Sequence, residues 1–207
     1  NGGAIGRGPE GGQFTLNNVL ISGNSAGSAG GGISTSSPMT LNNVTLVDNR
    51  LTIAGGYGGG LTSFSTVVVR NSIIWGNTAP SQGNICPEGY GGCGTTTVTY
   101  SDVQGGWAGT GNLNVDPRLA PVGDYGGAIL SRALLPGSPV IDMGDPATCL
   151  ATDMRGLARS CPGDMGSFEF TGSGAETFTS LISSMNPVPY GGSVTFTASV
   201  TSTVGSP

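Results

Sequence analysis

The sequence contains no histidine and no lysine, so its seven cationic side chains are all arginine. Without histidine, neither acid/base catalysis by an imidazole nor metal binding through one is available. Twelve carboxylates outweigh the seven arginines and give a net charge of −5. Proteins that bind nucleic acid need a basic face to neutralise phosphates, so no nucleic-acid partner is expected.

Charged residues make up only 9% of the chain and aromatic residues 6%. No apolar run approaches the roughly 18 residues that span a bilayer, so membrane insertion is not expected. Glycine and proline, with 39 and 13 residues, account for about a quarter of the chain. Disordered chains combine such a composition with low hydrophobicity and high charge, whereas 36% of this sequence is hydrophobic. The composition therefore predicts a folded, all-β repeat protein with many tight turns.

The four cysteines are few, and their spacing matches no zinc or redox motif. They are Cys86, Cys93, Cys149 and Cys161. Four cysteines allow three disulfide pairings, of which the local one, Cys86–Cys93 with Cys149–Cys161, closes only short loops. Free buried thiols and a metal site are the alternatives. Disulfides would place the protein outside the cytoplasm, so we expect an extracellular or cell-surface location.

Internal repetition is the strongest pattern, with a period of about 25–28 residues. A glycine-rich segment recurs at residues 2–5, 30–33 and 58–61. A second block follows each of these segments, at residues 14–24, 39–49 and 67–77, with a degraded fourth copy at 98–103. The chain opens inside this repeat, so we expect a processed product or a fragment.

Each block alternates apolar and polar residues on both sides of a short interruption, which is the pattern of two strands joined by a bend. The interruption ends in Asn18, Asn43, Asn71 and Asp102. Asn and Asp tolerate the left-handed backbone that a sharp bend requires, so these four are the predicted kink residues. Strand, kink, strand and glycine-rich return make one coil of a parallel β-helix. We expect Leu16, Leu41 and Val69 to stack in its core, and the kink asparagines to hydrogen-bond to one another in a ladder.

The paired blocks resemble the repeats of polymorphic outer-membrane proteins and related parallel β-helix proteins of bacteria. Residues 71–77, 100–107 and 111–117 are similar to the late coils of such proteins. The resemblance implies a right-handed, single-stranded parallel β-helix over residues 1–170.

Residues 123–169 resemble the choice-of-anchor Q domain of bacterial surface proteins, through segments 134–142, 153–156 and 163–169. One departure is Arg132, where that family often carries histidine. The tail resembles the opening of a bacterial immunoglobulin-like repeat over residues 178–201. A complete sandwich of that kind needs about seven strands, so residues 171–207 are predicted to form a partial, two-stranded segment.

The densest polar cluster consists of Asp142, Asp153, Arg155, Asp164 and Glu169, with Asp145 and Arg159 nearby. It fits a Ca²⁺ site or a catalytic carboxylate pair. It equally fits charge-assisted hydrogen bonds that tie the last coil to a C-terminal cap, and the choice-of-anchor resemblance implies this cap. We therefore predict no catalytic residue, no metal and no cofactor.

Three function classes compete for this fold: a structural fibre subunit, a carbohydrate-binding adhesin and a polysaccharide lyase or hydrolase. The strand blocks carry only Asp48 and Asp102, at different block positions, so adjacent coils offer no glycosidase carboxylate pair. Trp75 and Trp107 could stack on a sugar or simply cover loop backbone. We predict a non-catalytic extracellular bacterial structural or adhesive protein.

Self-association into a homopolymer is the expected partnership, with a surface polysaccharide as the second candidate. The first coil has no visible cap and exposes a strand edge, which is a template for pairing. Residues 176–183 and 193–201 are predicted strands that lack a sheet. Pairing of these two surfaces would join subunits head to tail.

Overall fold

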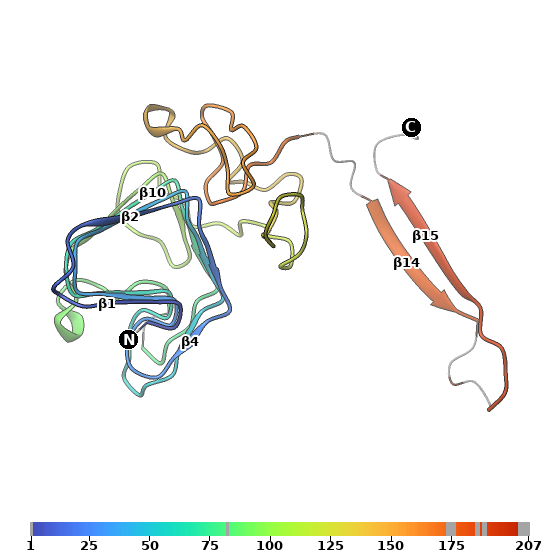
Figure 1. Ribbon diagram of the computed structural model, residues 1–207, viewed down its shortest axis with the longest axis horizontal. Helices are drawn as coiled ribbons and strands as arrows, with labels where there is room; N and C mark the ends of the chain where they lie inside the picture. The colour runs from blue at the N-terminus through green and yellow to red at the C-terminus, as the bar shows by residue number, and fades with distance from the viewer. Residues whose placement is uncertain (1, 82, 173–176, 185–186, 188–189, 203–207) are drawn as a thin grey trace. The chain divides into compact units, whose positions relative to one another are not determined.

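The computed structural model describes residues 2–81, 83–172, 177–184, 187 and 190–202. The chain divides into two compact units, Asn1–Phe170 and Thr171–Pro207. The first unit is a parallel β-helix whose coils overlie one another when viewed along the stack (Figure 1). No α-helix occurs among the described residues, which confirms the predicted all-β class.

The first unit consists of short strands and two 3₁₀ turns. In chain order these are β1 (Ile5–Arg7), β2 (Phe14–Asn17), β3 (Leu20–Ser22), β4 (Ser25–Ala26), β5 (Ile33–Thr35), β6 (Met39–Asn42), β7 (Thr45–Val47), β8 (Arg50–Leu51), β9 (Leu61–Ser63), β10 (Val67–Arg70), β11 (Ile73–Trp75), η1 (Tyr90–Gly92), β12 (Thr96–Thr99), β13 (Asp102–Val103) and η2 (Pro146–Thr148).

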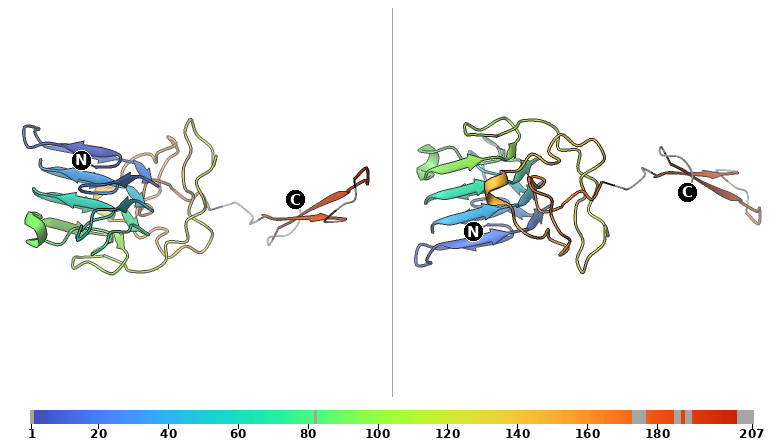
Figure 2. Two further views of the ribbon diagram at one scale, coloured as in Figure 1. Left: turned by 90° about the horizontal axis from the view of Figure 1, so that it is seen from below. Right: turned by 90° about the horizontal axis from the view of Figure 1, so that it is seen from above.

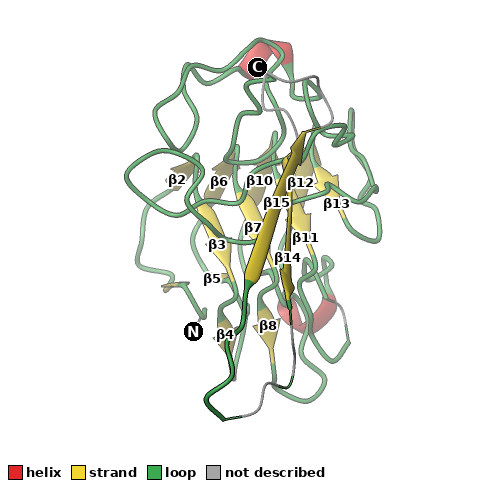
Figure 3. Ribbon diagram, turned by 90° about the vertical axis from the view of Figure 1, so that its right-hand side faces the viewer, coloured by secondary structure: helices red, strands yellow, loops and turns green. Residues whose placement is uncertain are grey.

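Equivalent strands of successive coils pair in parallel and form the walls of the β-helix (Figure 2). Their orders are β1-β5-β9, β2-β6-β10-β12 and β3-β7-β11-β13, with a short fourth sheet of β4 and β8. Figure 3 shows the second and third of these sheets side by side. Hydrogen bonds therefore run along the stack from coil to coil, and the apolar side of each strand faces the interior.

The predicted core column is confirmed by the strand register. Leu16 pairs with Leu41, Leu41 with Val69, and Val69 with Val98. Leu41, Val69 and Val98 have no exposed surface. A period of two on each strand thus fills the interior with stacked aliphatic side chains.

Three of the four predicted kinks are confirmed. Asn18, Asn43 and Asn71 have φ angles of 54°, 52° and 49°. The prediction for Asp102 is wrong, because β12 begins opposite Val67 and so brings Tyr100, with φ 45°, to the kink position. Asp102 instead lies inside β13, paired with Ile73. The degraded fourth repeat hides this shift of two residues.

An asparagine ladder is present, but at a different corner from the one predicted. Asn24 donates to Oδ1 of Asn49 at 3.0 Å, Asn49 to Asn77 at 2.9 Å and Asn77 to Asn84 at 3.0 Å. The backbone N–H groups of Asn24, Asn49 and Asn77 bond to the same oxygens. Each Oδ1 atom therefore accepts two hydrogen bonds from the preceding asparagine, one from its side-chain amide and one from its backbone N–H. These paired bonds fix the corner that follows the third sheet.

Both disulfides have the local pairing. Cys86 bonds to Cys93 and Cys149 to Cys161, and no free cysteine remains. The first closes the loop that contains η1, and the second closes the segment that follows η2.

The second unit contains an antiparallel pair of strands, β14 (Thr177–Ser183) and β15 (Phe196–Ser202), with Ser183 opposite Phe196. The two strands match the extended segment predicted from the sequence. Across the described part of the chain, no helix has the length and apolar character needed to cross a membrane.

Candidate functional site

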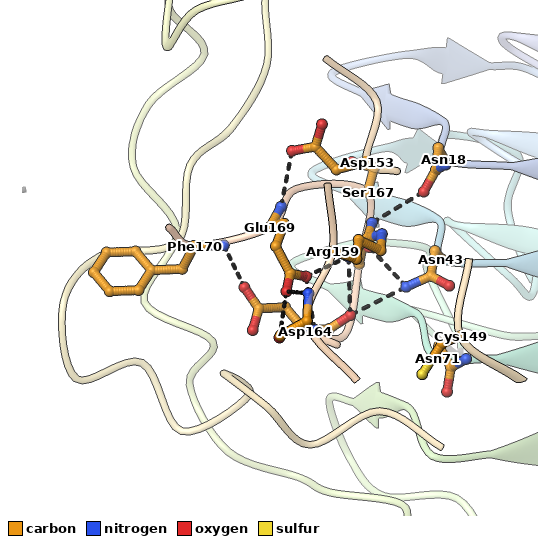
Figure 4. A network of polar contacts seen from close by, with 12 residues as sticks. Asn18, Asn43, Asn71, Cys149, Asp153, Arg159, Asp164, Ser167, Glu169 and Phe170 are labelled. Atoms are coloured by element: carbon orange, nitrogen blue, oxygen red, sulfur yellow. Dashed lines mark hydrogen bonds and ion pairs between the residues drawn. The ribbon is translucent and has the colours of Figure 1, made fainter. Parts of the chain in front are cut away.

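The segment from Asp142 to Glu169, here called the cap segment, lies along the column of kink asparagines (Figure 4). The side-chain amide of Asn18 donates to the carbonyl of Thr152 at 2.7 Å, and that of Asn43 donates to the carbonyl of Asp164 at 3.1 Å. The Asn71 amide donates to Oγ1 of Thr148 at 3.1 Å. The expected ladder among these three asparagines is therefore wrong, since each amide bonds to the cap segment instead.

Arg159 is the centre of the site. Its guanidinium donates to Oε2 of Glu169 at 2.8 Å, to Oδ1 of Asn18 at 3.0 Å and to the carbonyl of Gly166 at 2.8 Å. The side chains of Arg159 and Glu169 are 1% and 3% exposed. Burial lowers the pKa of the Arg159 guanidinium, while the charge of Glu169 opposes this shift. A buried ion pair with this many hydrogen bonds has its charges and donors satisfied.

A second buried ion pair joins Arg155 to Asp153 at 2.7 Å. The Asp153 carboxylate also accepts the backbone N–H groups of Arg155, Leu157 and Glu169. The Arg155 guanidinium lies over the ring of Phe168, 3.6 Å from its centroid, and donates to the carbonyl of Tyr125. These contacts hold the turn at residues 153–156 against Phe168 and Glu169, at the end of the cap segment.

Asp142, Asp164 and Glu169 place carboxylate oxygens within 4.8 Å of one another. Asp164 accepts the N–H groups of Asp142 and Phe170. Glu169 accepts from Asp164 N–H, from Arg159 and from both the N–H and the hydroxyl of Ser160. Burial raises the pKa of Asp164 to about 6, against the lowering effect of its two backbone donors.

These contacts favour a structural role for the acidic cluster. Protein donors already occupy the oxygens that a cation would need. The adjoining hollow, lined by Asn43, Asn71, Asp145 and Arg159 among others, has a volume of about 10 Å³. That is about the space of one water molecule. The arrangement can bind the coils together: Asp164 and Glu169 are buried, and Asp142 is the exposed member of the cluster.

Asp102 lies apart from this cluster and is fully buried in β13. One carboxylate oxygen accepts the N–H of Val115 at 3.0 Å, and the other has no hydrogen-bond partner among the described residues. Burial raises the pKa of Asp102 to about 6, the Val115 N–H lowers it, and the charge of Asp116 raises it further.

Arg132 forms an ion pair with Asp48 and donates to the carbonyl of Ala120 at 2.9 Å. It therefore joins the segment after the last coil to the turn that follows β7.

The tryptophans are partly buried. Trp75 packs against the core cluster of Val47, Ile73 and Met165. Trp107 packs against the main core and donates from Nε1 to the carbonyl of Thr96 at 3.3 Å. In the first unit the exposed aromatic side chains of the described residues are Phe64 and Tyr90, and no pattern in the sequence groups them. The sequence signal for Tyr90 is its position between two glycines, which Tyr57 shares, whereas Phe64 lies between two serines and carries no such signal.

No protein-family model, curated protein or solved structure matches this chain.

Proposed function

We propose that the protein is a non-catalytic extracellular structural protein of bacteria, a fibre subunit that assembles head to tail by β-strand pairing. Its two disulfides support an oxidising location outside the cytoplasm. The resemblances to polymorphic outer-membrane repeats, to the choice-of-anchor Q domain and to an immunoglobulin-like segment support a surface protein. The dense donor set around the acidic cluster supports a cap rather than a catalytic centre.

The observation that carries the proposal is the incomplete burial of the first coil. Four of its inward-facing side chains, Ile5, Phe14, Leu16 and Val19, are only partly buried, although Ile21 is 4% exposed. Their equivalents one coil later are at most 1% exposed: Ile33, Met39, Leu41 and Val44. In all three long sheets the first strand is an edge, with no pairing on its outer side among the described residues. Such an edge exposes both apolar surface and unpaired backbone groups.

The opposite end of the stack is covered by its own chain. The loop after β13 returns so that Tyr100 N–H donates to the carbonyl of Thr110 at 2.8 Å and Val103 N–H to that of Leu113 at 3.0 Å. Trp107, from the same loop, packs on the core. Among the described residues, the last coil is therefore covered by its own chain, whereas the first coil offers a strand edge to a partner.

The β14–β15 pair supplies strands of the right kind. A two-stranded sheet is only marginally stable in water by itself, so it gains from joining a larger sheet. Ile182 and Phe196 expose 63% and 67% of their surface and offer apolar area to a partner. Insertion of this pair from one copy against the first coil of the next is a heterologous contact, and repetition of it gives an open filament.

Deletion of residues 172–207 tests the proposal, because it keeps the first compact unit and removes the donor strands. We expect the full chain to sediment as polymers and to appear as filaments by negative-stain electron microscopy, and the shortened chain to be monomeric. A full chain that is monomeric at all concentrations contradicts the proposal, as does a shortened chain that forms the same filament. The first result would leave the edge to another occupant, and the second would assign the filament contact to the first unit alone.

A further inference from the structure

A hollow of about 240 Å³ opens on the surface of the first unit, beside the loop closed by the Cys86–Cys93 disulfide. Its walls come from segments of successive coils: Ser28, Leu51, Ile53, Tyr57, Phe64 and Tyr90. Because parallel coils repeat about every 4.8 Å, a wall built from three of them runs for roughly 10 Å along the stack. The hollow is therefore a short groove parallel to the axis of the β-helix.

Three aromatic rings line this groove, of which Phe64 and Tyr90 are exposed and Tyr57 is half-buried. The rings of Tyr57 and Tyr90 lie 5.4 Å apart and are tilted by 50°. Phe64 and Tyr90 are 45% and 54% exposed, and Ile53 is 43% exposed. In a chain with 6% aromatic residues, three rings around one hollow form a concentration of apolar surface that does not belong to the core.

Among the residues that the structure describes, no charged side chain lines the groove. Its walls consist of Ser28, Ala29, Leu51, Ile53, Ala54, Gly55, Gly56, Tyr57, Thr62, Phe64, Cys86, Tyr90, Gly91 and Cys93. A lining without cations offers no ion pair to a carboxylate, sulfate or phosphate group, so it favours a neutral ligand over an acidic one. Tyrosine combines an apolar ring with a hydroxyl, so the lining suits a ligand with both apolar faces and neutral hydroxyl groups.

The loops that carry the rings are held in place by local contacts. The disulfide closes the Tyr90 loop, and Cys93 N–H donates to the carbonyl of Tyr90 at 2.9 Å. The hydroxyl of Thr62 donates to the carbonyl of Tyr57 at 2.8 Å, and Gly56 N–H donates to that of Ile53 at 3.0 Å. A site that is already ordered before its ligand arrives loses less entropy on binding.

We propose that this groove is a binding site for a neutral polysaccharide, whose sugar rings stack on Tyr57, Phe64 and Tyr90. A pyranose ring presents an apolar C–H face and a rim of hydroxyls, which is the chemistry that the lining matches. The volume lies below the roughly 300–1,000 Å³ of sites for drug-sized ligands, so the groove holds only one or two sugar rings at a time. A protein partner fits less well, because a stable interface buries about 800 Å² on each side.

Isothermal titration calorimetry of the full chain against a panel of hexasaccharides tests the site. The neutral probes are cellohexaose, maltohexaose, laminarihexaose and chitohexaose, and the acidic probe is hexagalacturonate. We expect at least one neutral probe to bind and the acidic probe not to bind. Phe64→Ala and Tyr90→Ala should each weaken binding at least tenfold, whereas Tyr90→Phe, which keeps the ring, should bind within about threefold of the parent.

The matched control is Tyr190→Ala, which removes a fully exposed tyrosine outside the groove and should leave binding unchanged. Circular dichroism checks that each variant keeps the fold.

The proposal is overturned if no neutral probe binds, if hexagalacturonate binds equally well, or if the two alanine variants bind like the parent. Loss of self-association in Phe64→Ala without sugar binding would instead make the groove a protein contact. The groove and the open edge are separate, so filament formation should survive Tyr90→Ala.

Discussion

Arg159 and Asn18 are 141 positions apart in the sequence, yet the guanidinium donates to the side-chain oxygen of the asparagine at 3.0 Å. The same guanidinium forms the buried ion pair with Glu169. One side chain thus joins the kink of the first coil to the end of the cap segment. Because Asn43 and Asn71 bond to the same segment, the cap fastens three successive coils together.

Replacement of Arg159 by methionine should destabilise the protein by about 3–5 kcal/mol, because it leaves the Glu169 carboxylate buried without its partner. Urea denaturation measures the free energy of unfolding. The matched control is Arg70→Met, on the exposed face of β10, which should change it by less than about 0.5 kcal/mol. Equal stabilities of the two variants would show that the cap does not fasten the coils.

Asn43→Val should cost roughly 1–3 kcal/mol, because a β-branched residue is strained at a φ of 52°. Asn43→Gly separates the two roles of this residue. Glycine tolerates the backbone but loses the bonds to the carbonyls of Asp164 and Gly166, so its cost should be smaller but measurable. A melting temperature unchanged in both variants would contradict the kink and its contact with the cap.

The repeat made the coils predictable from sequence, because period-two alternation and a recurring asparagine specify strand, bend and register locally. The prediction of the fourth kink was wrong because its block has no asparagine at the bend, and Tyr100 occupies that position instead. The partners of the kink residues were not predictable. They come from irregular segments 74 to 141 positions away, which carry no periodicity to place them.

The asparagine corner ladder shows the opposite case. Asn24, Asn49 and Asn77 recur at the end of each block, so the signal was present in the sequence. The kink asparagines form a second column in the sequence, directly inside the strand blocks, and this column predicts the ladder at the wrong corner. The aromatic groove needed the fold, since only stacking brings Tyr57 and Tyr90 together.

Stability should fall as the pH rises from about 4 to 6. The pKa values of Asp102 and Asp164 are raised from 3.8 to about 6 in the folded state, so the unfolded chain ionises first and is favoured as the pH increases. A shift of about two pKa units corresponds to at most about 3 kcal/mol for each group. The stabilisation that the two protonated carboxyls give to the folded state is complete below pH 3.8 and is lost as the pH rises through 6.

Asp102→Asn isolates one of these groups. The asparagine oxygen can still accept the Val115 N–H, but no buried charge forms at neutral pH. We expect the variant to be more stable than the parent at pH 7 and to have a flatter stability profile between pH 4 and 6. The exposed control Asp124→Asn should keep the parent profile. A steep profile that persists in Asp102→Asn would contradict the assignment.

Alkylation of the native protein without reductant should modify no cysteine, as mass spectrometry can show. The double replacement Cys149→Ser with Cys161→Ser should destabilise the protein by about 3 kcal/mol, because the bond closes a loop of 12 residues. Modified thiols in the native protein would contradict both pairings.

The open edge of the first coil can be blocked without loss of an internal hydrogen bond. The N–H groups of Phe14 and Asn18 point to the next coil, at 3.2 and 3.1 Å from their acceptors. By alternation along β2, the N–H of Thr15 points to the open edge, so Thr15→Pro removes a donor that only a partner strand could use. Gly12→Pro, in the exposed loop before β2, is the matched proline control.

Sedimentation velocity of these two variants beside the parent, over a range of concentrations, tests strand pairing between subunits most directly. We predict that the parent and Gly12→Pro form polymers with the same distribution of sizes, and that Thr15→Pro remains a folded monomer. Polymers of unchanged size in Thr15→Pro would contradict head-to-tail assembly through the first coil, as would a parent chain that never polymerises.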